Sequence, residues 1–332
     1  MPAVPARLRP LPSALAALAA FATLVACGGG GGSSAAPAGT GGGSGPEVTR
    51  LAVGIVPVVD HAAVFVAQAE GFFTEEGLTV TTQAVQGGAA AVPALVSGDL
   101  QAAFATYPSF FLAKSQGIDV TIVAEGIRAT EETGGVYVRA DSAIRKAADL
   151  AGKTIAVNTL NNTGDVTIKA VLREQGVDPA GVEFIELPFP DMKGALEQGR
   201  VDAAWLVEPF RSGVAAAGGR KVLVSYGGVA AGIPVSGLGM SKKFATENPR
   251  TAAAFARAIE KANALIAEQP DRARKAVTTY SKTTPEQAAG LELGRWIAGK
   301  PNVQELERWN DLLVQTGVLK DKVAVADLVL NT

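Results

Sequence analysis

Apolar strands and helical stripes alternate along this chain, and the alternation occurs twice. Residues 100–109 (LQAAFATYPS) and residues 201–210 (VDAAWLVEPF) each have the pattern of a short apolar strand that ends at a proline. The helix before each strand is expected to end at Gly98 or Gly199, because glycine adopts the left-handed conformation that closes a helix. This similarity at a spacing of about one hundred residues indicates a duplicated structural unit.

The similarity extends backwards into whole units. Each unit begins with a short apolar strand, continues through a loop and a helix that ends near a glycine, and reaches a second strand. The first unit has its strands at 51–54 and 78–85, and the second unit has its strands at 155–158 and 182–187. We therefore predict an α/β fold with two lobes, each a mainly parallel sheet flanked by helices.

Two crossings are expected to join the lobes. Glycines cluster at residues 134–139 and again at residues 232–237, where the chain would pass from one lobe to the other. The predicted first lobe comprises residues 47–138 and 234–332, and the second lobe comprises residues 139–233. Beyond Asn248 and Pro249, which have the pattern of a helix start, the chain is predicted to be helical.

The N-terminus has the pattern of a secretion signal. Arg7 and Arg9 precede an apolar run over residues 11–25 that is too short to span a bilayer. The run ends in Leu-Val-Ala-Cys, which resembles a bacterial lipobox, so Cys27 is the predicted lipidation site and residues 1–27 the lipoprotein signal peptide. The alternative is a simple secretion signal with an incidental cysteine.

The segment after the signal has the composition of a tether. Residues 28–46 consist almost entirely of Gly, Ser, Ala, Pro and Thr, which cannot bury a core. A lipid on Cys27 followed by this tether would hold the folded body at a membrane face without inserting it. The predicted location is therefore extracytoplasmic and anchored to the membrane by lipid.

Composition excludes several classes of function. The 332 residues carry 30 basic and 32 acidic side chains without a basic block, which argues against nucleic-acid binding. With one histidine and one cysteine, the chain has no Cys/His nucleophile pair and no Cys/His metal cluster. No phosphate-binding glycine loop is present, so neither a cofactor nor a metal is expected. Acid–base catalysis by Asp60, Asp165 or Glu208 stays open, but the pattern favours binding over catalysis.

The candidate site lies where the predicted parallel strands end. Ligands bind outside the carboxyl ends of such strands, and two facing lobes would enclose them in a cleft that closes by a hinge. Glycines before a helix also let backbone N–H groups approach a ligand, although a tight connection alone would explain them. The candidate ligand-binding residues are Asp60, His61, Gln86, Gly87, Gly88, Tyr107, Ser109, Thr159, Asn161, Asn162, Thr163, Glu208 and Phe210.

Several motifs together resemble one family. Residues 67–73 (AQAEGFF), 98–104 (GDLQAAF), 149–153 (DLAGK) and 201–210, together with Val56-Pro57, look like the solute-binding proteins of ABC importers in the nitrate, sulfonate, taurine and thiamine-pyrimidine group. The resemblance implies the two-lobed periplasmic-binding-protein fold of type II and a ligand in the cleft. It also implies a monomer that delivers its ligand to a membrane permease and its ATPase.

The ligand is predicted only by class. The candidate residues are rich in amides, aromatics and acids, which suits a small polar organic solute: a sulfonate, an aromatic carboxylate or a pyrimidine-like, planar or zwitterionic compound. Glu208 and Phe210 have an alternative structural interpretation, because the Glu-Pro pair recurs in the resembled family whatever the ligand. Two other functions stay open: a pyrimidine-processing enzyme of the same fold and a ligand-sensing lipoprotein outside transport.

Overall fold

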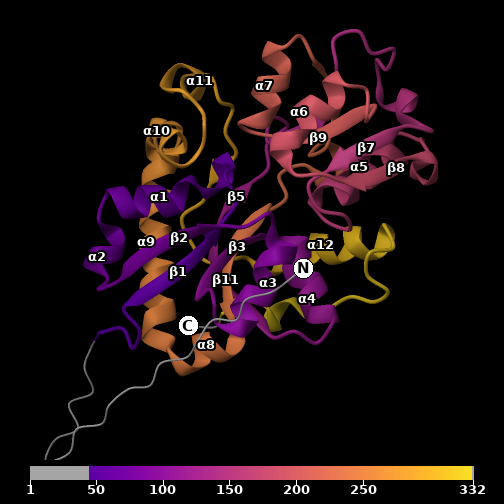
Figure 1. The fold of residues 1–332 in the computed structure, drawn as a ribbon. Coiled ribbons are helices and arrows are strands. Elements are labelled where there is room, and N and C mark those ends of the chain that lie inside the picture. Colours follow the sequence, from indigo (N-terminus) through magenta and orange to yellow (C-terminus); the bar gives the residue numbers. More distant parts are fainter. Residues whose placement is uncertain (1–44, 331–332) are drawn as a thin grey trace, which may run out of the picture. The chain divides into compact units, whose positions relative to one another are not determined.

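The computed structural model describes residues 45–330, which form two five-stranded sheets with flanking helices (Figure 1). The predicted signal peptide, Cys27 and most of the predicted tether lie outside the described residues. None of the helices within residues 45–330 is long and apolar enough to cross a membrane.

The first sheet has the strand order β2-β1-β3-β11-β4. Strand β1 pairs in parallel with β2 and β3, whereas β11 is antiparallel to both β3 and β4. The first lobe is built on this sheet. Its strands are β1 (Arg50–Ile55), β2 (Thr79–Ala84), β3 (Ala102–Thr106), β4 (Val120–Glu125) and β11 (Ser236–Ser241).

The second sheet repeats this plan in the order β10-β6-β9-β7-β8. Strand β7 pairs in parallel with β8 and β9, and β6 is antiparallel to β9 and β10. The second lobe is built on this sheet, and the duplicated unit predicted from the sequence is present in both lobes. Its strands are β6 (Gly134–Val138), β7 (Thr154–Val157), β8 (Glu183–Glu186), β9 (Ala203–Val207) and β10 (Arg220–Val224).

The first boundary between the lobes differs from the sequence prediction. Residues 134–138 were expected to end the first lobe, but they form β6, a full member of the second sheet. The antiparallel strand of each sheet is the one that enters directly after a crossing, and a pattern based on the repeated parallel units contains no signal for it. The first crossing therefore precedes Gly134.

The two crossings lie against each other. Ala129 N–H donates to the Ile233 carbonyl (2.9 Å), and Val235 N–H donates to the Ile127 carbonyl (2.8 Å). The short strand β5 (Ile127–Arg128) in the first crossing also pairs with β12 (Arg295–Trp296). The chain thus passes between the lobes through paired backbone segments, where a small rotation can change the angle between the lobes.

The helices follow local signals that the sequence contains. Gly98 and Gly199 end their helices with φ of 85° and 66°, as predicted from the repeat. Asn248 precedes the helix that starts at Pro249, but its side chain makes no cap hydrogen bond and Nδ2 donates to the Phe244 carbonyl instead. The helices are α1 (Ala62–Ala69), α2 (Phe72–Glu75), α3 (Gly88–Ser97), α4 (Tyr107–Ser115), α5 (Thr163–Glu174), α6 (Phe189–Glu197), α7 (Phe210–Ala216), α8 (Lys242–Glu247), α9 (Pro249–Glu268), α10 (Asp271–Tyr280), α11 (Pro285–Ala289) and α12 (Val303–Gln315).

The C-terminal helices pack on the first sheet and reach the second lobe. In α9 the predicted apolar stripe is buried, with Phe255 and Ile259 both 0% exposed. Helix α12 contacts both α4 and α5, and Trp309 Nε1 donates to the Pro234 carbonyl in the second crossing (2.7 Å). This helix therefore contacts both lobes and is bonded to the second crossing.

Candidate functional site

A small cavity lies at the carboxyl ends of the central parallel strands, with walls from both lobes. Its volume is about 30 Å³, space for about two water molecules. Five of the candidate residues line it: Asp60, Gly87, Gly88, Thr159 and Asn162. The position outside the strand ends is the one expected for an open parallel sheet.

Ten further lining residues were not among the sequence candidates, four of them valines (Val56, Val58, Val207 and Val235) and six of them aromatic or polar. The six aromatic or polar residues are Phe104, Thr106, Asn158, Phe189, Trp205 and Tyr226. The aromatic members form an apolar wall; Phe189 lies with its ring centroid 5.8 Å from that of Trp205. Trp205 Nε1 donates to Ser225 Oγ (2.9 Å), so its ring is held in place. In the sequence these aromatics have the pattern of strand and helix core, and only the packing of one lobe against the other places them at the cavity.

The lobes contact each other beside the cavity. Thr106 Oγ1 donates to Asn162 Oδ1 (2.5 Å), and Asn162 Nδ2 donates to Ser109 Oγ (2.9 Å). A Cβ atom on Gly87 would lie 2.9 Å from Thr159 Oγ1 in the other lobe. A larger residue at position 87 would therefore force Thr159 or the two lobes to shift.

Two helices, α3 and α5, begin at this cavity, and they differ in whether a side chain caps their first N–H groups. Asn162 caps α5 by accepting from Thr163 N, and the Asp165 carboxylate accepts from Asn162 N (2.8 Å). Helix α3 starts at Gly88, and no side chain of the described residues caps it. Because free N–H groups and the helix dipole attract anions, α3 offers the better seat for a negatively charged ligand group.

Asp60 carries the ionisable carboxyl group of the cavity wall. It is 7% exposed, and within residues 45–330 its Oδ1 has no hydrogen-bond partner. Burial raises the pKa of Asp60 to about 7, because a charged carboxylate is poorly solvated there. An unpaired buried acceptor of this kind is available to a donor on a ligand.

His61 and Tyr107 have structural surroundings and lie outside the cavity wall. Val56 N–H donates to the His61 ring (3.3 Å to Nδ1), and that ring lies 3.5 Å, centroid to centroid, from Phe104. Burial lowers the pKa of His61 well below its ordinary value, so this side chain is neutral. Tyr107 is fully buried at the start of α4. His61 thus contacts Phe104, which lines the cavity, but does not line the cavity itself.

The remaining candidates lie close by but do not line the cavity. Ser109 lies behind it, bonded to Asn162, and Phe210 stacks on Phe189 with centroids 5.4 Å apart. Phe210 lines a separate groove of about 800 Å³ together with Tyr280 and Leu291 of the first lobe. The other candidates that the cavity excludes are Gln86, Asn161, Thr163 and Glu208.

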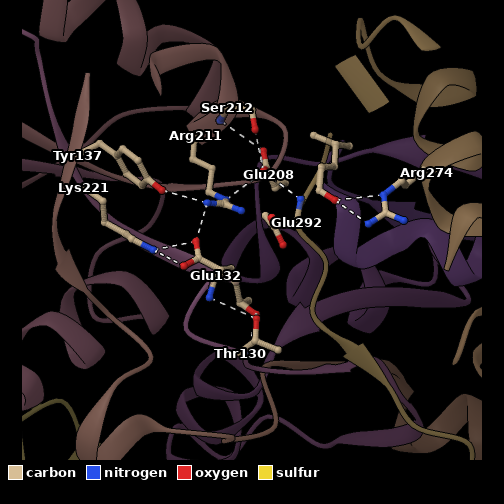
Figure 2. Close-up of polar contacts among 11 residues, drawn as sticks. Thr130, Glu132, Tyr137, Glu208, Arg211, Ser212, Lys221, Arg274 and Glu292 are labelled. Atoms are coloured by element: carbon tan, nitrogen blue, oxygen red, sulfur yellow. Dashed lines mark hydrogen bonds and ion pairs between the residues drawn. The ribbon is translucent and has the colours of Figure 1, made fainter. Parts of the chain in front are cut away.

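Glu208 belongs to a buried polar cluster of the second lobe (Figure 2). Its Oε1 lies 3.0 Å from Arg211 Nε and accepts from Ser212 Oγ (2.8 Å). Arg211 also donates to Glu132 (3.0 Å) and to the Tyr137 hydroxyl (3.1 Å). Burial raises the pKa of Glu208, and the Arg211 charge opposes that rise. The Glu208 carboxylate, which lies in the repeated segment 201–210, therefore already has hydrogen-bond donors and a cation from the protein itself.

The same cluster ties the lobes together behind the cavity. Glu292 N–H, in the segment after α11, donates to Glu208 Oε1 (3.4 Å), and Val59 N–H donates to the Glu208 carbonyl (3.2 Å). Figure 2 shows Glu132, which precedes β6, held between Arg211 and Lys221. The cluster thus fixes the end of the first crossing against the second lobe.

The chain is similar to proteins of one known family. The family model described as NMT1/THI5 like matches residues 58–273. The chain belongs to this NMT1/THI5-like family.

Among the described residues, no group of three or more His, Cys, Asp or Glu side chains is placed to hold a metal ion.

Individual relatives agree with the family and the fold. The taurine-binding periplasmic protein of Escherichia coli is 30% identical over 208 residues, 62% of each chain, and the nitrate/nitrite binding protein NrtA of Synechococcus elongatus is 24% identical over 259 residues, 68% of this chain and 57% of that protein. The matches thus span less than two thirds of these relatives. The alkanesulfonate-binding protein SsuA of Xanthomonas axonopodis pv. citri, solved with MOPS, superposes with a TM-score of 0.73 at 19% identity, covering 86% of this chain and 99% of that one. The fold of this NMT1/THI5-like chain is that of the periplasmic binding proteins.

Proposed function

We propose that this NMT1/THI5-like protein is the extracytoplasmic solute-binding component of an ABC importer. The observation that supports this most strongly is the cavity at the strand ends, whose walls come from both lobes. A solute that contacts Gly88 and Asn162 together gains contacts only when the lobes are closed, and such differential affinity drives closure. Relatives named for taurine and nitrate binding support the same class of function.

The proposed ligand is a small polar organic solute of the sulfonate, aromatic carboxylate or pyrimidine-like class. The open N-terminus of α3 would receive its acidic group, and the rings of Trp205 and Phe189 would cover its apolar part. Because the cavity is about 30 Å³, the lobes must separate to admit any organic solute. A larger solute would extend into the groove lined by Phe210 and Tyr280.

The test is ligand binding with a readout of lobe closure. The mature protein is titrated with taurine, ethanesulfonate, nitrate, benzoate and a thiamine-type aminopyrimidine, with thermal melting as the readout. A ligand that binds should also decrease the radius of gyration in small-angle scattering. Binding without compaction would contradict the closing mechanism, and chemical conversion of a bound compound would favour the pyrimidine-processing enzyme instead.

The partners and the anchor belong to the same proposal. The protein would act as a monomer, carry a lipid on Cys27 and deliver its solute to a permease and its ATPase. Expression of the full chain and of a Cys27→Ala variant in a bacterium, followed by membrane fractionation, tests the anchor. Equal fractionation of the two forms would contradict it, and a gene neighbourhood without a permease would favour the ligand-sensing lipoprotein.

A further inference from the structure

Two residues that line the cavity from opposite lobes each have a buried oxygen atom with no hydrogen-bond partner among residues 45–330. Asp60 Oδ1 comes from the loop after β1, and the Tyr226 hydroxyl comes from the residues after β10. Both residues line the cavity, and their exposed fractions are 7% and 1%. Buried polar atoms in native proteins nearly always have a partner, so these two atoms indicate a group that the polypeptide does not supply.

The described residues that line the cavity offer Asp60 no positive charge. Of the side chains described in residues 45–330, none that lines the cavity is lysine, arginine or histidine. His61 is neutral and bonded to Val56 N, and the Tyr280 hydroxyl donates to the Val58 carbonyl (3.0 Å). A ligand with only an acidic group would place its charge close to the Asp60 carboxyl in a poorly solvated space, which is unfavourable.

The acceptors and the donors of the cavity belong to different elements. Asp60 and Tyr226 present oxygen atoms, whereas the uncapped start of α3 at Gly88 presents backbone N–H groups. We propose that the solute is a small zwitterion, whose protonated amine is bound by Asp60 and Tyr226 and whose acidic group is bound by the α3 N-terminus. This inference rests on the function proposed above and narrows its substrate class from small polar organic solutes to amino acids and aminosulfonates.

Matched ligand pairs test the proposal directly. Taurine is compared with ethanesulfonate, and β-alanine with propionate, by calorimetry at pH 7, since each pair differs by the amine alone. We expect the amine-bearing member of at least one pair to bind about tenfold more tightly or better, the effect of one hydrogen bond to a charged group. The preference should disappear in Asp60→Asn and decrease in Tyr226→Phe.

A matched control comes from another buried carboxyl group. Glu125 is 2% exposed, and burial raises its pKa to about 7, as for Asp60, but it does not line the cavity. Glu125→Gln should therefore keep the preference for the amine. Because the readout is a ratio of two affinities within one variant, a general loss of stability does not imitate the effect.

Proton release is the second readout. With an Asp60 pKa of about 7, binding of an ammonium group at pH 7 should release about half a proton, measured by calorimetry in buffers of different ionisation enthalpy. Asp60→Asn should abolish this release. His61 does not contribute because its pKa lies well below, and burial raises the pKa of both Tyr226 and Tyr280 well above 10.

The outcomes separate the inference from the proposed function. If neither pair shows tighter binding of its amine-bearing member, the zwitterion is overturned while a solute-binding function stays in place. If no member of either pair binds, the inference is overturned, and the wider solute panel above decides the function by itself. A preference for amines that survives Asp60→Asn would overturn the assignment of Asp60.

Discussion

The loop after β1 and the loop after β9 each carry a buried acid, and the two loops touch, since Val59 N–H donates to the Glu208 carbonyl. Asp60 has an oxygen with no partner among the described residues, whereas Glu208 is met by Arg211, by Ser212 and by the backbone of Glu292. Burial raises the pKa of both carboxyl groups. The difference is the neighbouring cation, so the presence of a fixed positive charge distinguishes a structural acid from one available to a ligand.

The largest expected loss of stability follows from removing the Glu208 carboxylate, which is paired with Arg211. Glu208→Ala leaves the buried Arg211 with less compensating charge, and we expect a loss of about 3 kcal/mol in the free energy of unfolding, measured by urea denaturation at pH 7. Ligand preference should be unchanged. The control is Glu197→Ala, which removes an exposed ion pair with Lys193 (3.5 Å) and should change stability by less than about 1 kcal/mol. Similar losses for the two variants would contradict the comparison.

Asp60→Asn should act in the opposite direction. The pKa of Asp60 is about 7 in the folded state against an ordinary 3.8, so the folded state binds more protons between these values and its stability decreases as pH rises through that window. Asparagine removes this dependence. We expect the variant to be about 2 kcal/mol more stable than the wild type at pH 5.5 and nearly equally stable near pH 4, by thermal melting without ligand. A difference that does not vary with pH would refute the buried-acid interpretation.

Gly87→Ala tests whether solute binding requires the close approach of Gly87 in the first lobe to Thr159 in the second lobe. Gly87 is extended, with φ of 173°, so alanine suits the backbone, but its Cβ would lie 2.9 Å from Thr159 Oγ1. Solute affinity should decrease about tenfold while the free energy of unfolding changes by less than about 0.5 kcal/mol. Gly194→Ala, whose Cβ would meet no atom within 4 Å, is the control. Unchanged affinity would mean that binding does not require this contact.

The smallest expected effect comes from removing one partner of Glu208, the Ser212 hydroxyl, while the other partner stays. Ser212→Ala removes the hydroxyl that donates to Glu208 Oε1 (2.8 Å) and leaves Arg211 in place. A loss of about 1 kcal/mol is expected, measured by urea denaturation beside Glu208→Ala. If Ser212→Ala were as damaging as Glu208→Ala, the hydroxyl rather than the guanidinium would be the main partner of the acid.

Part of the site was predictable because it depends on local signals. Glycines before a helix and polar residues after a strand are visible in the sequence, and Gly88, Thr159 and Asn162 do line the cavity. Trp205 and Tyr226 were not predictable in this way. Trp205 has the pattern of strand core, and Tyr226 follows an edge strand, so only the packing of one lobe against the other gives them a role at the cavity.

The sequence by itself determined the duplicated unit, the helix ends at Gly98 and Gly199 and the mainly parallel sheets, because each depends on neighbouring residues or on a repeat. Only the tertiary structure decided that residues 134–138 belong to the second sheet and that Glu208 is saturated while Asp60 is not. These facts depend on partners far away in the chain, such as Glu292 for Glu208. The energy of a buried charge is set by the groups that folding places around it, and local sequence does not encode their positions.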